Sequence, residues 1–304
     1  MTIVLPVISK LLSESLLSLY PVFVKNIQLP LDLQLWSRLL IYVIVSFLFS
    51  SFGFLKNNLF KWVCILLSII NFIHIYTSYR GFQLLESGVS YTLFYTYPII
   101  IILLSQTNFN LETILAVMIA FVGVYLISSS DIKNGHENFE EKKKEEINHK
   151  EKREEEKIEN YKYEGYLMIF LAALTEALIY FQVRKIKTDN NWNHVFISYF
   201  LGAVFISLYF VLFRQNELLT VSTNTLKTFS LSMIINAIIG SFGYYLRFYA
   251  TSRLGPILYS ILSYFGIVMS FVYGIIFNKD IITMKKIIGA IMIMISNFVL
   301  IRKI

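Results

Sequence analysis

The chain has 304 residues, of which 56% are hydrophobic and 16% aromatic, and its formal net charge is +7. Because residues 131–164 are almost wholly polar, the remainder is more apolar than a soluble core permits, and the composition predicts an integral membrane protein. The basic residues are scattered among short loops and span ends, which argues against a nucleic-acid partner. Cys64 is the only cysteine, so an internal disulfide and a cysteine zinc site are excluded, and we expect no metal and no cofactor.

Uncharged apolar runs predict most of the membrane-spanning helices, since they reach the roughly 17 to 25 residues that cross a bilayer. Two further segments, 3–24 and 165–183, qualify only if their internal charges are tolerated: Lys10 and Glu14 in the first, Glu176 in the second. The runs do not alternate apolar with polar residues as barrel strands do, so the sequence predicts an all-α bundle of ten transmembrane helices. In chain order the uncharged runs are 39–55, 62–79, 89–109, 113–130, 195–213, 228–246, 254–278 and 287–301.

The charged segment 131–163 divides the chain into two parts. It mixes both signs of charge with few apolar residues, which predicts a solvated linker, either disordered or a lone charged helix. Residues 1–130 then form a first five-helix repeat and residues 164–304 a second. Because five spans are an odd number, two homologous halves must be inserted with opposite orientations, an arrangement typical of secondary transporters.

Short internal matches support two related halves. The sequence Ser-Glu-Ser-Leu at 13–16 recurs as Thr-Glu-Ala-Leu at 175–178. Three residues of the first half recur 167 positions later: Arg80 as Arg247, Gly88 as Gly255 and Tyr97 as Tyr264.

Ten spans place both termini on the same side of the membrane. We expect cytoplasmic termini, because this orientation puts slightly more Lys and Arg inside than outside. The count places Arg38 outside, at the start of the second span. The sequence does not identify the membrane itself.

Several of these features resemble the drug/metabolite transporter superfamily, in particular its EamA-like and solute carrier 35-like members. The resemblance lies in Pro21 and Lys25 closing the first span, Arg38 opening the second, and the span junctions at 79–88 and 248–256. It implies that the third, fourth, eighth and ninth helices line a central cavity, with the first and sixth beside them. The ninth span lacks the Gly-Ala-Leu-Asn-Lys stretch of nucleotide-sugar carriers and the Lys-Arg pair of plastid phosphate translocators, which argues against both subfamilies.

Ionisable residues inside the spans are candidates for a substrate site, since a charge in hydrocarbon is costly. Glu14 and Glu176 lie near mid-depth of their helices, where each is either a proton carrier or a structural counter-ion. Their expected partners are Arg80 and Arg247, whose planar forks suit a carboxylate or phosphate. Arg80 ends its span and has the alternative of extending to the headgroups.

Hydroxyl groups recur at helical spacing in the fourth and ninth spans and predict a wall that orients a polar solute. Packing between membrane helices is the alternative explanation for such residues. His74 in the third span is a further candidate, again with a structural hydrogen bond as the alternative. The hydroxyl-bearing residues of the two walls are Tyr91, Thr92, Tyr95, Thr96 and Tyr97 in the fourth span and Tyr259, Ser260, Ser263 and Tyr264 in the ninth; the candidates for substrate contact among them are Tyr91, Tyr97, Tyr259, Ser263 and Tyr264.

The sequence therefore predicts a secondary-active transporter that moves a small polar organic metabolite by alternating access between two inverted repeats. Protons or a counter-substrate are candidate coupling partners for transport. The lipid bilayer surrounds the protein, and a second copy of the chain is a candidate homodimer partner. The alternative function is a transporter-like membrane protein that acts as an interaction or regulatory partner through its linker. No catalytic motif is present, so we do not expect an enzyme.

Overall fold

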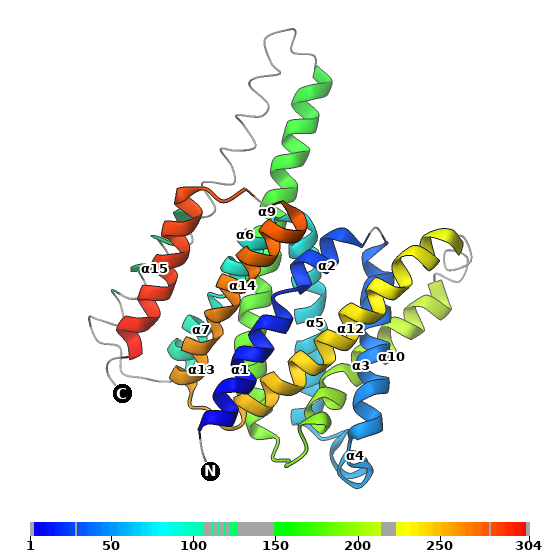
Figure 1. Ribbon diagram of the computed structural model, residues 1–304. Helices are drawn as coiled ribbons and strands as arrows, with labels where there is room; N and C mark the ends of the chain where they lie inside the picture. Colours follow the sequence, from blue (N-terminus) through cyan, green and yellow to red (C-terminus); the bar gives the residue numbers. More distant parts are fainter. Residues whose placement is uncertain are drawn as a thin grey trace.

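The computed structural model describes residues 3–27, 29–105, 149–213, 223–279 and 281–301, together with Leu111, Leu115, Met118, Ile119, Val122, Gly123, Tyr125 and Leu126. Within this part of the chain every element is a helix (Figure 1). The first half contains α1 (Val4–Leu17), α2 (Tyr20–Asn26), α3 (Leu31–Phe49), α4 (Phe52–Asn58), α5 (Trp62–Leu84), α6 (Ser87–Phe94) and α7 (Tyr97–Leu104). The second half contains α9 (His149–Lys185), α10 (Asn191–Phe213), α12 (Thr223–Thr251), α13 (Pro256–Ser263), α14 (Phe265–Tyr273), the π-helix η1 (Gly274–Asn278) and α15 (Met284–Ile301).

Among the described residues, seven helical segments are long and apolar enough to cross a membrane. The expected fourth span is shorter, at Val89–Leu104, and most of the expected fifth span, 113–130, lies outside the described residues. The linker predicted at 131–163 is described only from His149 onward, where it is the helical beginning of α9. The fold is thus an all-helical, multi-pass membrane bundle.

Three of the expected spans are interrupted near their middle. The first divides into α1 and α2, the fourth into α6 and α7, and the ninth into α13 and α14. Pro21 and Pro98 occupy the first turn of α2 and α7, where a missing N–H costs least. Broken helices are how many transporters bring polar groups to the middle of the membrane.

The second span begins earlier than the sequence predicted. Helix α3 starts at Leu31, so Arg38 lies inside the helix and is only 2% exposed, and its predicted place at the start of the span is wrong. The sequence prediction placed span boundaries at charged residues, so it started this span after Arg38. Here the guanidinium is covered instead by tyrosine rings, the nearest being that of Tyr20 at 4.1 Å.

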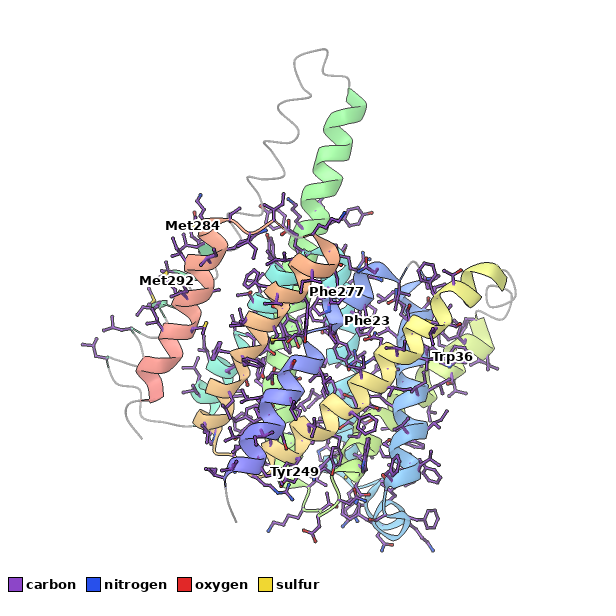
Figure 2. The ribbon with its side chains drawn as sticks, viewed as in Figure 1. Phe23, Trp36, Tyr249, Phe277, Met284 and Met292 are labelled. Carbon is purple, nitrogen blue, oxygen red and sulfur yellow. The ribbon has the colours of Figure 1, made fainter. Side chains whose placement is uncertain are left out.

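The helices form a bundle whose interior combines apolar side chains with many buried polar and charged ones, and whose outer surface carries large apolar side chains. Helix α5 packs along α9, α1 packs along α12, and α3 lies beside α10. Large apolar side chains such as Phe277 on η1 and Met284 on α15 lie at the outer surface (Figure 2). Helix α1 begins in the lower half of Figure 1, whereas α9 begins above the other helices and runs down into the bundle.

Candidate functional site

A network of buried charges joins three helices at the centre of the bundle. Arg247 of α12 donates from Nη1 to Glu176 Oε1 of α9 at 2.7 Å. Its Nη2 atom lies 3.0 Å from both carboxylate oxygens of Glu14 on α1. All three side chains are at most 2% exposed, so one guanidinium bridges two carboxylates that water does not reach.

Lys10 completes this network. It lies one helical turn before Glu14, and its ammonium group donates to that carboxylate. The Lys10 Nζ atom also lies 3.3 Å from the Tyr97 hydroxyl and 3.6 Å from the centroid of the Tyr259 ring. With Lys10 included, two cations balance two carboxylates, which is the condition under which buried charges are tolerated.

The predicted hydroxyl wall surrounds the charges. Tyr97 donates to Ser263 Oγ at 2.8 Å, and Ser263 donates to the Tyr259 carbonyl at 2.8 Å. Tyr95, at the junction of α6 and α7, donates to Glu14. The rings of Tyr91 and Tyr264 pack against that of Tyr95 with centroid distances of 4.9 Å and 6.3 Å.

His74 of α5 adjoins the network from the side of Glu176. Its Nε2 atom lies 3.3 Å from Glu176 Oε2 and 3.1 Å from the Tyr244 hydroxyl. Its Nδ1 atom lies 3.1 Å from the carbonyl oxygen of Ala172 on α9. The ring is therefore held between α5, α9 and α12.

The structure does not bring Arg80 into the network. Its Nε and Nη2 atoms donate to the two carboxylate oxygens of Glu164 at 2.7 Å and 3.1 Å, and its side chain is 28% exposed. The other nine candidate residues are buried and lie in or against the network. Sequence reasoning placed Tyr95 in the hydroxyl wall but missed Lys10 as a member of the site. For Lys10 the signal was present, because a spacing of four residues places it on the same helix face as Glu14.

Gly266 of α14 makes the contact between Tyr95 and Glu14 possible. A Cβ atom at this position would overlap the Tyr95 hydroxyl and lie 3.0 Å from Glu14 Oε2. We expect Gly266→Ala to lower the free energy of unfolding by about 1–3 kcal/mol, the usual cost of overpacking. The measurement is the melting temperature of the purified protein.

Gly53 of α4 provides the matched control, since a Cβ atom there would have no neighbour within 4 Å. Gly53→Ala should be neutral or stabilising, because alanine is the better helix former by roughly 1 kcal/mol. Equal melting temperatures for the two alanine variants would contradict the close approach at Gly266.

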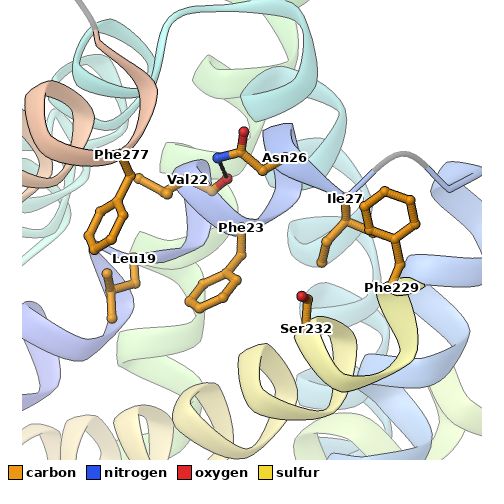
Figure 3. A pocket seen from close by; sticks show the side chains of 8 residues that line it. All are labelled: Leu19, Val22, Phe23, Asn26, Ile27, Phe229, Ser232 and Phe277. Carbon is orange, nitrogen blue, oxygen red and sulfur yellow. Dashed lines mark hydrogen bonds between the residues drawn. The ribbon is translucent and has the colours of Figure 1, made fainter. Parts of the chain in front are cut away.

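One pocket lies away from the charges. It has a volume of about 260 Å³ and lies between α2, the beginning of α12 and η1 (Figure 3). Most of the side chains around it are apolar, so it lacks the charged groups of the central network. Its lining residues are Leu19, Val22, Phe23, Asn26, Ile27, Phe229, Ser232 and Phe277.

The bundle and its polar centre define a multi-pass integral membrane protein. Residues 163–302 match the model of the EamA-like transporter family, which confirms the predicted resemblance to the drug/metabolite transporter superfamily. One solved structure, described simply as a crystal structure of a protein, is similar over 99% of both chains with a TM-score of 0.61 and 14% identity. At that identity the likeness concerns the fold alone. No curated protein sequence matches the chain.

Proposed function

We propose that this protein is a secondary-active carrier that moves a small polar organic metabolite across a membrane by alternating access. The observation that carries the proposal is the position of Arg247. It comes from the second half of the chain and binds one carboxylate from each half, Glu14 of the first and Glu176 of the second. A charge network that joins the two halves can hold them closed, and a charged solute that competes for it can release them.

The packing of the helices supports two related halves, which we propose to be ten helices in two inverted repeats, 1–130 and 164–304. Helix α5 packs along α9, and the corresponding pair with the halves exchanged, α12 and α1, also packs together. Likewise, α3 contacts α12 and α10 contacts α5. An internal two-fold relation between the halves would produce these exchanged pairs.

The proposed solute is bound by the charges and hydroxyls at the centre. Lys10 and Arg247 attract its negative group, Glu14 and Glu176 attract its positive group or a proton, and the tyrosines at 91, 97, 259 and 264 surround its body. Binding a solute or proton at these groups changes the charge balance that links the halves, and this change couples binding to the rocking motion. Arg80 stays outside this site, in its ion pair with Glu164.

Reconstitution tests the proposal against the alternative of a docking protein. We expect liposomes that contain the purified protein to take up labelled metabolites from a mixed extract, and a variant that lacks residues 133–160 to transport at an unchanged rate. That segment includes the first turns of α9, which project from the bundle (Figure 1). If neither protein moves any solute, and the deletion abolishes binding of a partner, the carrier proposal is wrong and the docking alternative is favoured.

A further inference from the structure

A further buried cation lies next to the network but outside it. Arg38 of α3 is 2% exposed, and its guanidinium carbon lies 4.1 Å from the ring centroid of Tyr20 and 4.8 Å from that of Tyr79. The rings of Tyr42 and Tyr244 follow at 5.0 Å and 5.7 Å. These four tyrosines, contributed by α2, α3, α5 and α12, form what we call the tyrosine cage.

The tyrosine cage does not satisfy the hydrogen-bonding capacity of Arg38. Cation–π contacts act on a guanidinium through the ring faces and leave its edge N–H groups to other acceptors. In the part of the chain that the structure describes, Arg38 Nε and Nη1 have no hydrogen-bond partner, and no carboxylate forms an ion pair with this residue. Buried donors that carry a full charge are costly when unmet. The cage therefore has one positive charge more than it neutralises, whereas the neighbouring network is balanced.

Small and polar residues of α12 connect the pocket, the cage and the network. Five positions at spacings of four, four, four and three share one helix face. Ser232 lines the pocket (Figure 3), and Asn236 donates to the Tyr79 hydroxyl at 3.1 Å. Gly240 has no side chain, and a Cβ atom there would overlap the hydroxyls of Tyr20 and Tyr42. The face ends at Tyr244 and Arg247.

Tyr244 is the link between the two charged regions. Its ring centroid lies 5.7 Å from the guanidinium carbon of Arg38 and 5.4 Å from that of Arg247. The ring of a single side chain therefore contacts both guanidinium groups. The order along α12 is pocket, Arg38, Arg247.

We propose that Arg38 and the tyrosine cage form a second binding station, which receives the carboxylate of a small monoanionic solute on its way between the pocket and the central network. This inference rests on the proposed carrier function and names its substrate class. One guanidinium neutralises one negative charge, so a monocarboxylate balances the cage whereas a phosphate dianion leaves a surplus. The tyrosine rings accommodate the apolar or aromatic body of the solute.

Ligand-induced thermal stabilisation of the purified full-length protein tests the station without requiring transport. We expect 3-phenylpropionate and hexanoate to raise the melting temperature, and 3-phenylpropionamide and phenyl phosphate to have little effect, because only the monocarboxylates complete the charge balance. In Arg38→Gln the carboxylates should bind at least about tenfold more weakly, as expected for the loss of a charge-assisted hydrogen bond. Without ligand, Arg38→Gln should melt at a higher temperature than the wild type, since an unbalanced buried charge is removed.

Arg253→Gln is the matched control. Arg253 also stacks on a tyrosine, with its guanidinium carbon 3.9 Å from the ring centroid of Tyr249, but it is exposed. This variant should respond to the carboxylates as the wild type does. If Arg38→Gln does not yield folded protein, Arg38→Lys replaces it, and binding at least about tenfold weaker than in the wild type is again expected because the planar fork is lost.

Three results would overturn the station: no response of the wild type to either carboxylate, an equal response to the amide or the phosphate, or unchanged carboxylate binding when Arg38 is replaced. Transport is scored separately. Carboxylate binding that requires Arg38 in a protein that moves no solute would preserve the station and reject the carrier function. If the protein takes up solute but its carboxylate binding does not depend on Arg38, the carrier function is preserved and the station is rejected.

Discussion

Replacing Arg247 by glutamine should lower the free energy of unfolding by about 3–5 kcal/mol, the usual cost of removing one partner of a buried ion pair. Arg247 is 2% exposed and hydrogen-bonds to both Glu14 and Glu176. Without it, Lys10 alone faces two carboxylates that water does not reach. The measurement is the melting temperature or denaturant midpoint of the protein in a single detergent.

Arg80 supplies the matched control, because it occupies the corresponding position in the first half of the sequence. Its ion pair with Glu164 is partly exposed, so Arg80→Gln should cost no more than about 1 kcal/mol. The double variant Arg247→Gln/Glu176→Gln should be more stable than Arg247→Gln alone, since it restores one cation to one carboxylate. Similar losses in Arg247→Gln and Arg80→Gln, with no recovery in the double variant, would show that the central charges do not depend on one another.

Glu14→Gln should reduce solute uptake into liposomes by at least about tenfold and change its dependence on pH. The Glu14 carboxylate receives hydrogen bonds from Lys10, Tyr95 and Arg247, so its loss removes an ion pair between α1 and α12 and leaves two cations facing one carboxylate. Glu176→Gln should have the same kind of effect but a smaller one. Glu176 accepts one hydrogen bond from Arg247, and its second oxygen lies 3.3 Å from His74.

Initial rates of uptake by the wild type and both variants, at several pH values and with the membrane potential dissipated, provide the measurement. Glu164→Gln is the control, because this glutamate is also paired with an arginine but lies at the edge of the bundle, with 33% of its side chain exposed. Its pH profile should match that of the wild type. Proton coupling through the central glutamates is rejected if uptake is indifferent to pH in the wild type and in both glutamine variants.

Helix content and most helix positions could be predicted from composition and apolar runs, because hydrocarbon admits only backbone that satisfies its own hydrogen bonds. The predicted helix boundaries are wrong where a charged residue lies inside a helix. Counting uncharged residues began the second span at residue 39, whereas α3 begins at Leu31 and buries Arg38. Apolar runs also carry no signal for the interruptions of three spans, since the residues around Tyr264 remain apolar through the break between α13 and α14.

The candidate site was predicted in part, because intramembrane charge is rare enough to be informative. Glu14 and Glu176, which the sequence placed at mid-depth, lie together with Arg247, one of their two expected partners. The internal repeat predicted the same role for Arg80 and Arg247 as partners of the glutamates, but only Arg247 reaches the centre of the bundle. A repeat specifies corresponding positions on two helices, whereas the neighbouring helix decides which partner each side chain finds.

The sequence by itself determined that this is a helical membrane protein, that it resembles EamA-like transporters, and that a few charges inside its spans need partners. These are consequences of local composition, since the cost of an unpaired charge in hydrocarbon does not depend on which helices meet. Only the tertiary structure decided which charges pair. It balanced Lys10 and Arg247 against two glutamates, placed Arg80 at the edge, and left Arg38 among tyrosines with two unmet donors. Pairing depends on the approach of helices distant in the chain, and the spacing of residues along a single helix does not contain that information.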